Sequence, residues 1–505
     1  SSGESQIMAA DARWPSSQDT VRRISDVVHS SIALPPPLDV IVDTVEFQRL
    51  RNIRQLGAAD LVFPCANHTR FTHCIGASHI AQLFMEALRA DQSLHITGAD
   101  ALCVALAALC HDIGHGPYSH LYDGPFLESV GRKWTHEEGS KALLNRVLRT
   151  ERVETALRPF LGPEGEEEYE RNLLFIQECI SPPSPMMDDS GAWLPKGRPR
   201  EKAFLYDIVS NVHDGFDVDK FDYILRDAHF SGVGIRFNRE SLLRLIHNIR
   251  VLPCPRVGIP RICFAKKTAD DLLSLADSRH SLHARVYQHH TVKLLEAMIV
   301  KALVAAEPHF HFENAERKSF TLSTIIDDYD LFCTVDDSVL QMIGRSHDPQ
   351  LAKARRIVLA IRERRLARRI SLVECSPSAI KAKTGNGGPD VARMHQKICK
   401  DISERLLQAV PTVDDEQVFV LSRRLFSGLD GCRHPMSEVL VFDNKAAKPT
   451  AGRLNEHWLD LRASRHTTVI TFALYVSRDL SDSQTEDLKR EFESALENYG
   501  IHKTG

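Results

Sequence analysis

The segment that most constrains the fold is an apolar run that ends in titratable side chains. Residues 101–110, ALCVALAALC, carry no charge and predict a helix buried on every face. His111 and Asp112 follow at once, and His115 and His120 come shortly after. An unpaired carboxylate at the end of a buried helix costs free energy. The arrangement therefore indicates a metal or phosphate site or, alternatively, an unusually polar helix end.

Helical spacing of apolar residues extends over most of the chain. It predicts helices at 40–56 and 79–88 and a long helical stretch at 270–306. Between them, the segments NIRVL and PRICFAK flank PCPRVGI and predict a β-hairpin. Helices are expected to dominate to about residue 370.

The character of the chain changes after the glycine-rich segment TGNGGPD at 384–390. The segments QVFVLS, EVLVFD and TTVITFALYV then predict strands, and a last helix is expected near Ser483, with Glu486 completing a capping box. The fold class is therefore mainly α, with a small α+β C-terminal lobe. We expect four parts: a disordered N-terminus at 1–20, a catalytic core at 21–330, a helical connector and linker at 331–414, and the lobe at 415–505.

Charge and cysteine content narrow the setting. The chain has 63 basic and 67 acidic residues, a formal net charge of −4, so no global field favours nucleic acid or a membrane surface. No apolar run approaches the roughly 20 residues of a membrane span. The 11 cysteines form no CxxC pair, and the leading SSGESQIMAADARW lacks an apolar signal core. We expect no membrane partner and an intracellular location, in the nucleus or cytoplasm, rather than secretion.

Partners for His111 and Asp112 occur at a distance in the sequence. His73 lies in HTRFTHCIG, and Asp219 lies in FDVDKFDYILRDAHFSG. Two imidazoles and two carboxylates suit iron, manganese or zinc better than calcium, and they leave positions open for water and substrate. Such a site can generate hydroxide near neutral pH. Taken alone, His73 would instead be a hydrogen-bonded core or surface histidine.

The helix that carries Asp219 has a polar stripe. Asp219, Tyr223 and Asp227 fall at i, i+4 and i+8 on one face, and Lys220 adjoins them. Carboxylate, phenol and carboxylate do not form a core stripe. The alternative is a solvated face with an ion pair between Asp222 and Arg226.

A later helix repeats this spacing. Arg279, His283 and Tyr287 share a face and are followed by Gln288. Together with Arg70 and Lys220, Arg279 would complete a basic ring suited to a polyphosphate. The alternative for Arg279 is an exposed charge.

More histidines occur than one metal needs. His115, His120 and His136 are suited to general acid or base work near neutral pH, unless they are polar loop side chains that face solvent. Gly114 and Gly116 would let the loop turn sharply after the helix.

These residues resemble those of the HD-domain superfamily of metal-dependent phosphohydrolases, because His73, His111-Asp112 and Asp219 follow one another in the order that is typical of that superfamily. Further segments, within roughly Val21 to Val304, are similar to the animal sterile-alpha-motif and HD-domain deoxynucleoside triphosphate triphosphohydrolases: FQRLRNIRQLG, HTRFTHCIG, LCHDIGHGPYSH, KWTHEEGS, FLYDIVSN, DVDKFDY and SLHARVYQH. The resemblance implies an HD-domain helical core. The C-terminal lobe is more weakly similar, and functions tied to the sterile-alpha-motif domain are not expected here.

The resemblance also implies the reaction and the roles in it. The reaction would be hydrolysis of a dNTP to deoxynucleoside and tripolyphosphate, controlling dNTP pools, by attack of activated water on the α-phosphorus. His73, His111, Asp112 and Asp219 would hold a transition metal, with Mg²⁺ as a further cofactor. His136, His115 and Asp123 would surround the attacking water or a second ion, and His120 would protonate the 5′ leaving oxygen.

The resemblance implies a set of substrate contacts as well. Arg70, Lys220 and Arg279 would bind phosphates, Gln55 and Asp227 would bind the 3′-hydroxyl, and Tyr287 would exclude a ribose 2′-hydroxyl. The whole expected set is Gln55, Leu56, Arg70, Lys220, Tyr223, Asp227, Arg279, His283, Tyr287 and Gln288.

Regulation is implied in the same way. The family enzyme is a tetramer activated by guanine nucleotide and a second dNTP, so a GTP or dGTP activator and a homo-oligomer, dimer or tetramer, are expected. Asp43, Gln48 and Arg51 match the guanine-reading residues, with Arg22 beside them. At the second activator site Val62, Phe63 and Lys267 match, whereas the positions of basic or amide side chains hold Ser241, Ala265, Asp271 and His290.

Two other functions remain open on the sequence alone. An HD-type phosphodiesterase would keep the metal but not the triphosphate contacts. The second is a nucleic-acid-binding protein with a vestigial site. Its basic segment KARRIVLAIRERRLARR, 353–369, is expected to be a helix and could bind the phosphates of a single strand. A charge-rich helix of this kind is more often a solvated or interface element.

Overall fold

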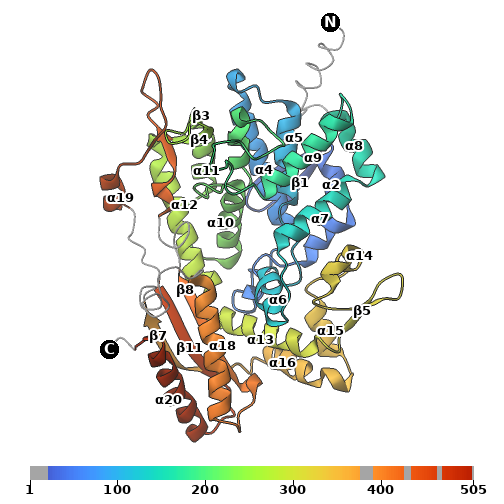
Figure 1. Cartoon of the computed structure of the whole chain (residues 1–505), viewed down its shortest axis with the longest axis vertical. Coiled ribbons are helices and arrows are strands. Elements are labelled where there is room, and N and C mark those ends of the chain that lie inside the picture. The colour runs from blue at the N-terminus through green and yellow to red at the C-terminus, as the bar shows by residue number, and fades with distance from the viewer. Residues whose placement is uncertain (1–20, 376–390, 426–433, 463–468, 503–505) are drawn as a thin grey trace.

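The computed structural model describes residues 21–375, 391–425, 434–462 and 469–502. The expected disordered N-terminus, 1–20, and the linker segment 384–390 lie outside these residues. Figure 1 shows helices gathered in the upper and middle parts of the molecule, with a small sheet and two helices, α18 and α20, below them. The fold is mainly α, as predicted.

The helices before the lobe are α2 Leu38–Val42, α3 Val45–Gln48, α4 Arg70–Arg89, α5 Gly98–Cys110, α6 Leu127–Ser129, α7 His136–Leu148, α8 Glu151–Leu161, α9 Glu166–Ile180, α10 Val218–Ser231, α11 Arg239–Ile246, α12 Ala269–Leu282, α13 His290–Ala306, α14 Tyr329–Phe332, α15 Val339–Arg345 and α16 Ala352–Arg362. Short 3-10 helices are η1 Arg49–Asn52, η2 Ala59–Leu61, η3 Gln92–Leu94, η5 Arg200–Asp207, η6 Lys266–Thr268, η8 Ile325–Asp327, η9 Pro349–Leu351, η10 Asp415–Gln417 and η11 Pro435–Ser437. Two π-turns are η4 Tyr122–Phe126 and η7 His283–Tyr287.

The predicted apolar helix is the centre of the core. Every residue from Ala101 to Cys110 in α5 is at most 1% exposed. The helix packs between α4 and α9, and α4 packs on its other side against α10. A capping box at Thr97 and Asp100 starts α5. Because α5 is surrounded, the residues that follow Cys110 are delivered into the interior.

Two of the predicted helices are broken by local caps. The stretch 40–56 is not one helix, because Thr44 accepts the backbone N–H of Phe47 and starts α3 after α2 has ended. The stretch 270–306 divides into α12, the π-turn η7 and α13, where His289 caps the new helix by accepting from the Thr291 N–H. The helix predicted at 79–88 is the second half of α4.

The predicted hairpin is part of a larger sheet. β3 Ile249–Pro253 and β4 Pro260–Ala265 pair antiparallel, and the sheet order is β10-β9-β4-β3. β9 Leu440–Phe442 pairs parallel with β4, and β10 Gly452–Arg453 pairs with β9. The segment EVLVFD is therefore a strand as predicted, but it adds to the sheet of the core instead of the sheet of the lobe.

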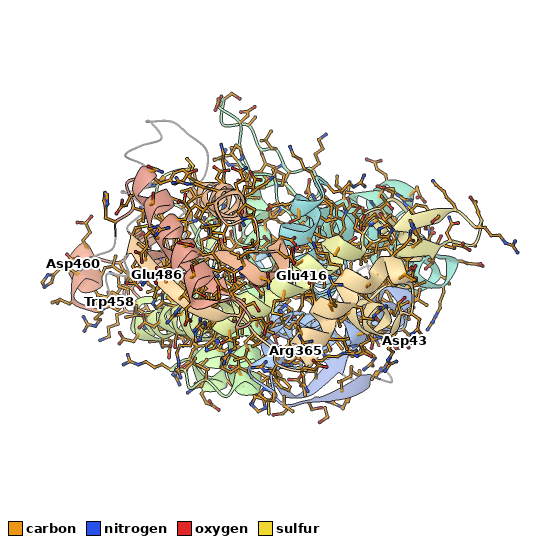
Figure 2. The ribbon with its side chains drawn as sticks, turned by 90° about the horizontal axis from the view of Figure 1, so that it is seen from below. Asp43, Arg365, Glu416, Trp458, Asp460 and Glu486 are labelled. Carbon is orange, nitrogen blue, oxygen red and sulfur yellow. The ribbon has the colours of Figure 1, made fainter. Side chains whose placement is uncertain are left out.

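The remaining elements include two small hairpins. β1 Arg22–Asp26 pairs with β2 Ser30–Leu34, and β5 His311–Glu313 pairs with β6 Ser319–Thr321. A peripheral helix, α19 Glu456–Arg462, carries Trp458 and Asp460, which Figure 2 shows at the opposite side of the view from Asp43.

The C-terminal lobe begins earlier in the chain than predicted. Its antiparallel sheet has the order β7-β11-β8, formed by β7 Arg368–Cys375, β11 Val469–Val476 and β8 Val418–Leu425. The helices α18 Val391–Ala409 and α20 Asp482–Asn498 contact these strands and each other. The basic segment 353–369 is helical only in α16, which ends at Arg362, and its last residues enter β7.

The apolar strand β11 is explained by burial on both faces. Ile470, Phe472, Leu474 and Val476 pack into a cluster with α18 and α20, whereas Ala473 and Tyr475 belong to the large cluster of the core. Successive side chains of a strand point to opposite faces, so a strand between two hydrophobic layers is apolar on both faces. Its buried threonine, Thr471, accepts a hydrogen bond from Arg423 Nε at 3.2 Å.

A lysine from the core anchors this sheet. Lys301 of α13 donates from Nζ to the Val418 carbonyl at 2.8 Å, and its ammonium lies 4.2 Å from the ring centre of Phe419. Burial, with Lys353 nearby, lowers the pKa of Lys301 to about 8.

No described helix is long and apolar enough to cross a membrane.

The start of α20 provides a test of the structure against the sequence pattern. Ser481 caps α20 and forms a capping box with Gln484, two residues before the predicted pair Ser483 and Glu486. Ser481→Ala should cost about 1 kcal/mol of local stability, and the first-turn amides should then exchange roughly fivefold faster. Hydrogen exchange with peptide resolution measures this. Ser483→Ala is the matched control, and an equal effect there would contradict the observed cap.

Candidate active site

Four predicted side chains meet at the buried end of α5. His73 Nε2 lies 3.2 Å from His111 Nε2 and 3.1 Å from Asp219 Oδ1. Asp219 Oδ1 is 3.5 Å from His111 Nε2, and Asp112 Oδ2 is 3.5 Å from both imidazoles. Ligands about 2.0–2.2 Å from one transition-metal ion lie roughly 3–3.5 Å from one another. The donor atoms of His73, His111 and Asp219 therefore fit one such ion, and Asp112 Oδ2, which Arg70 also binds, lies beside them.

Hydrogen bonds behind the imidazoles orient them toward this point. His111 Nδ1 lies 2.8 Å from the Ala108 carbonyl, and His73 Nδ1 lies 2.8 Å from Asp222 Oδ2. Both contacts place the ring proton on Nδ1 and leave Nε2 free to bind a metal. The ring orientations thus exist in the protein itself.

Asp222 is a functional residue that the sequence did not reveal. The alternative interpretation placed Asp222 and Arg226 on a solvated face, yet both are fully buried. Asp222 accepts from Arg226 Nε at 2.8 Å and faces His29 Nε2 at 2.7 Å, and Asp26 binds the other side of Arg226. The hairpin β1-β2 therefore supports His73, a candidate metal ligand, from behind. No local pattern predicts this, because His29 and Asp222 are far apart in sequence.

The charges at the cluster favour a cation there. Burial opposes ionisation of His73, but Asp219 and Asp222 raise its pKa to about 10. Burial likewise opposes the charge on Asp219, but His111 and His73 hold its pKa below the usual range. The pKa of Asp112 is also held low, by Arg70 and the neighbouring histidines, against burial. A divalent ion would supply the positive charge that these carboxylates attract and leave the imidazoles neutral as ligands.

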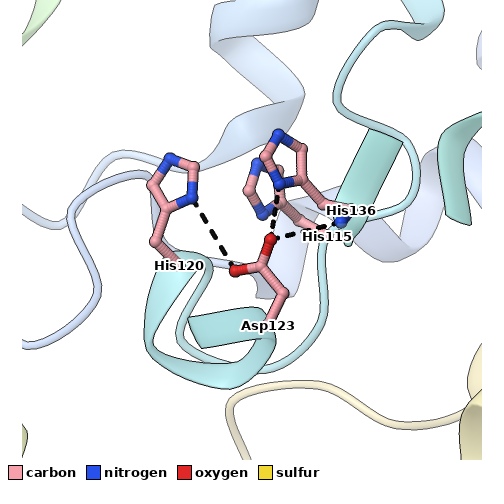
Figure 3. A group of neighbouring side chains, drawn as sticks. All are labelled: His115, His120, Asp123 and His136. Atoms are coloured by element: carbon pink, nitrogen blue, oxygen red, sulfur yellow. Dashed lines mark hydrogen bonds and ion pairs between the residues drawn. The ribbon is translucent and has the colours of Figure 1, made fainter. Parts of the chain in front are cut away.

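A second cluster lies beside the first (Figure 3). His136 Nδ1 is 2.5 Å from Asp123 Oδ2, and His120 Nδ1 is 3.7 Å from Asp123 Oδ1. The His115 ring stacks on that of His136, with centres 3.9 Å apart. Burial, together with Arg70 and His136, holds the pKa of His115 well below its usual range, so this imidazole is neutral. His115, His120, Asp123 and His136 could hold a second ion.

The three histidines of this cluster are held to different degrees. Thr135 caps α7 with Glu138, which fixes His136 at the first position of that helix. His120, by contrast, exposes 71% of its side chain. The three histidines are therefore not equivalent: His115 and His136 are packed into the protein, and His120 is the one that faces solvent, as the alternative interpretation expected for all of them.

Gly114 and Gly116 have a different role from the predicted one. Neither has a positive φ, so neither is needed for a sharp turn. A Cβ on Gly114 would lie 2.1 Å from the Ser140 nitrogen, and one on Gly116 would lie 2.3 Å from the Tyr122 ring. These glycines allow close packing. The left-handed residues are instead Tyr118, φ 60°, and Ser119, φ 57°, directly before His120.

One cavity of about 480 Å³ joins both clusters to the expected substrate contacts. Of the predicted residues, Gln55, Leu56, Arg70, His111, Asp112, His120, His136, Asp219, Lys220, Tyr223, Asp227, Arg279, His283 and Tyr287 line it. Gln288 is not among the lining residues, and its carbonyl accepts from Arg423 at 3.1 Å. The sequence did not single out Glu137, Ile180, Val209, Ser210 and Asp217, which line it too.

The cavity has a cationic side and a side where a phenol, a carboxylate and an imidazole meet. Lys220 donates to Asp217 at 2.9 Å, and Arg279 Nε lies 3.2 Å from the Tyr223 hydroxyl. Tyr287 donates to Asp227 Oδ2 at 2.5 Å, and His68 binds the other oxygen of Asp227 at 2.8 Å.

Two lining side chains have features that suit a bound ligand. Gln55 Oε1 is buried without a hydrogen-bond partner among the described residues. Burial, with Arg279 nearby, lowers the pKa of His283 to about 4, so His283 is neutral.

The expected guanine-reading residues form a surface group away from the cavity. Arg22 pairs with Asp43 at 2.6 Å, and Arg51 Nε donates to Gln48 Oε1 at 2.7 Å. Arg51 also lies 3.6 Å from the ring centre of Phe71.

The expected second activator site is less complete. The Phe63 ring lies 5.6 Å from His289, Val62 ends the turn η2, and Lys267 lies in η6. The departing residues Ser241 and Asp271 both bind Arg244.

Comparisons with known proteins agree with this geometry. The HD domain family matches residues 70–181. The chain is 38% identical over 353 residues to the deoxynucleoside triphosphate triphosphohydrolase SAMHD1 of Bos taurus, covering 69% of this chain and 58% of that protein. The protein of the same name from Homo sapiens is 38% identical over 352 residues, with 69% and 54% covered. The SAMHD1 homolog of Dictyostelium discoideum is 32% identical over 383 residues, with 75% and 66% covered. The chain thus spans between about half and two thirds of these relatives.

Gly116 is expected to be intolerant of a side chain. The Tyr122 ring that a Cβ would meet is fully buried, and its hydroxyl donates to the Leu322 carbonyl at 2.7 Å. Gly116→Ala should therefore lower the free energy of unfolding by about 1–3 kcal/mol, measured by urea denaturation. A Cβ on Gly124 would meet nothing within 4 Å, so Gly124→Ala is the control. Equal stability of the two variants would contradict the packing role.

Asp222 is expected to control metal affinity without touching the ion. Asp222→Asn removes the carboxylate that orients His73, and we expect roughly 10–100-fold weaker binding of a transition metal. Competition with a chelator measures this affinity. Asp270→Asn, at an exposed carboxylate of α12, should leave the affinity unchanged. Unaltered metal binding by Asp222→Asn would show that the support is not needed.

Proposed function

We propose that this chain hydrolyses dNTPs to deoxynucleoside and tripolyphosphate, because its residues 70–181 match the HD domain family and 69% of its length is similar to the deoxynucleoside triphosphate triphosphohydrolase SAMHD1 of Bos taurus. The observation that carries the proposal is that one cavity is lined by metal-binding side chains, a solvent-facing histidine and three cations. Metal, proton donor and phosphate contacts are what hydrolysis at an α-phosphorus requires.

His73, His111, Asp112 and Asp219 would hold iron, manganese or zinc, which would supply Lewis acidity at the α-phosphate and lower the pKa of a bound water. A bond would form between the water oxygen and the α-phosphorus while the water gives up a proton to the neighbouring His136–Asp123 pair or to solvent, and the bond between the α-phosphorus and the 5′ oxygen would break. His120 would donate a proton to that oxygen, so the deoxynucleoside leaves and the three phosphates remain together as tripolyphosphate. His115, His136 and Asp123, which lie beside His120, would orient the water or hold Mg²⁺.

The other residues of the cavity bind the substrate. Arg70, Lys220 and Arg279 offset the charge of the triphosphate. The unpartnered Gln55 Oε1 accepts from the 3′-hydroxyl, together with Asp227. Because Tyr287 is held by Asp227 at 2.5 Å, its ring occupies the space beside the sugar, which excludes a 2′-hydroxyl. Deoxynucleotides are therefore preferred over ribonucleotides.

Regulation is proposed on the residues at the surface. A GTP or dGTP activator would bind at Arg22, Asp43, Gln48 and Arg51, and a second nucleotide would bind at Val62, Phe63 and Lys267 in a homo-oligomer, a dimer or tetramer. The pairing of Arg22 with Asp43 and of Arg51 with Gln48 supports a preformed first site. The enzyme would act on dNTP pools inside the cell, in the nucleus or cytoplasm.

The two alternative functions have less support. The basic residues of α16 are tied into the protein, since Lys353 pairs with Asp415 at 2.8 Å and Arg356 with Glu416 at 2.7 Å. This favours an interface role over binding of single-stranded nucleic acid. A phosphodiesterase would not need Arg279, so Arg279→Ala would leave its turnover nearly intact.

Product analysis tests the proposal. Each dNTP is incubated with the protein, with and without GTP, and we expect deoxynucleoside and tripolyphosphate, with little turnover of ribonucleotides. His111→Ala should lose metal and activity together, whereas His120→Ala should keep the metal and lose about 10²–10⁴-fold in kcat. The control is His347→Ala, which changes the exposed histidine of a different His-Asp pair and should leave metal content and activity unaffected. Orthophosphate or pyrophosphate as the sole product would overturn the proposal.

A further inference from the structure

The turn that presents His120 is held in a conformation that its own residues disfavour. Tyr118 and Ser119 have φ values of 60° and 57°, in the left-handed region that side chains with a Cβ rarely adopt. Two such residues in succession need support from the surrounding structure. His120 follows directly, so any relaxation of this turn would move its imidazole.

Arg70 binds the Ser119 hydroxyl at 2.9 Å, and a distant carboxylate binds the backbone of the turn itself. Asp337 Oδ1 accepts the backbone N–H of Tyr118 at 2.6 Å, and the Tyr118 hydroxyl donates to the Asp337 carbonyl at 3.1 Å. The other carboxylate oxygen, Oδ2, accepts the backbone N–H of Arg54 at 2.9 Å. Asp337 is only 8% exposed, so these bonds are shielded from water.

The same carboxylate therefore joins two walls of the cavity. Arg54 precedes Gln55, which lines the cavity, and Tyr118 is two residues before His120, which also lines it. A further bond closes the link, since the Ser119 hydroxyl donates to the Arg54 carbonyl at 2.6 Å. Asp337 itself is not among the residues that line the cavity. It comes from the segment 331–414, which the sequence placed outside the catalytic core.

We propose that Asp337 is a positioning residue, which fixes His120 against the loop of Gln55 by binding both backbones at once. This inference rests on the proposed function, in which His120 protonates the leaving oxygen. Asp337 needs to be a carboxylate in this geometry, because the two N–H groups are bound by different oxygens, Oδ1 and Oδ2. An asparagine has one acceptor oxygen, and its NH₂ would face a backbone N–H.

The test compares Asp337→Asn with Asp336→Asn. The Asp336 side chain accepts only from the nearby Ser338 N–H, so this control makes the same chemical change one residue away. Hydrogen exchange is measured on peptides that span 50–57 and 114–122. Asp337→Asn should speed exchange at least fivefold in both peptides and nowhere else in the core, and Asp336→Asn in neither. Unchanged exchange in both peptides overturns the proposal, whatever the activity of the protein.

Kinetics then separate positioning from general stability. In Asp337→Asn we expect kcat for a dNTP to fall at least tenfold, with KM changed less than threefold and metal content equal to that of the wild type. Added to His120→Ala, the same change should cost less than twofold, because residues that act through one another are not additive. A full tenfold cost in that background overturns the proposal.

Two further outcomes are distinguishable. If the wild type does not release tripolyphosphate, the proposed function fails, and the exchange measurement alone decides whether Asp337 holds the two segments. If Asp337→Asn does not fold, Tyr118→Phe removes the hydroxyl that binds the Asp337 carbonyl and keeps the ring. It should speed exchange in peptide 114–122 at least twofold, and unchanged exchange there overturns the proposal.

Discussion

The candidate active site depends on the contact between His73 and the buried carboxylate of Asp222. This contact fixes the ring proton of His73 on Nδ1 and points Nε2 at His111 and Asp219. Asp222 can remain ionised in the core because Arg226 and His29 also bind it, and Asp26 binds Arg226 in turn. A Cβ on Gly76 would lie 1.9 Å from Asp222 Oδ1, so a glycine in α4 is needed for the two helices to approach. The hairpin β1-β2, helix α4 and helix α10 are thus locked together by one ionic group.

Different helices and turns supply the side chains of the cavity that is built on this support. The end of α5 supplies His111 and Asp112, and the first turn of α10 supplies Asp219 and Lys220. The π-turn η7 then brings Tyr287 to Asp227. Since a continuous α-helix from 270 to 306 would rotate these side chains, the irregular turn is part of how the wall with Tyr287 and Asp227 is formed. His120 lines another part of the cavity, and the strained residues before it, Tyr118 and Ser119, are supported by the distant carboxylate of Asp337.

Much of this could be predicted from the sequence. The helix α5 follows from an apolar run with no charge, and the burial of Asp112 at its end made a binding partner necessary. The stripe Asp219, Tyr223 and Asp227 followed from helical spacing, and all three line one cavity. Five strands, β3, β4, β8, β9 and β11, were found from their β-branched and aromatic residues, whereas β7 lies in the segment that was expected to be a helical connector. The sequence did not give the exact helix boundaries: the cap of α20 is Ser481 instead of Ser483, and a new helix starts after Thr44. It also did not give the sheet to which β9 belongs, because that depends on a partner strand distant in sequence.

The sequence by itself determined which side chains are candidates for the chemistry, because metal-binding and acid-base groups are confined to a few residue types and their spacing along a helix sets which share a face. The tertiary structure alone decided how these groups are held. Asp222 and Asp337 are ordinary aspartates in sequence, and Gly114 and Gly116 have the appearance of turn residues. Their roles arise from hydrogen bonds and close packing between segments that only folding brings together, and such contacts leave no local pattern along the chain.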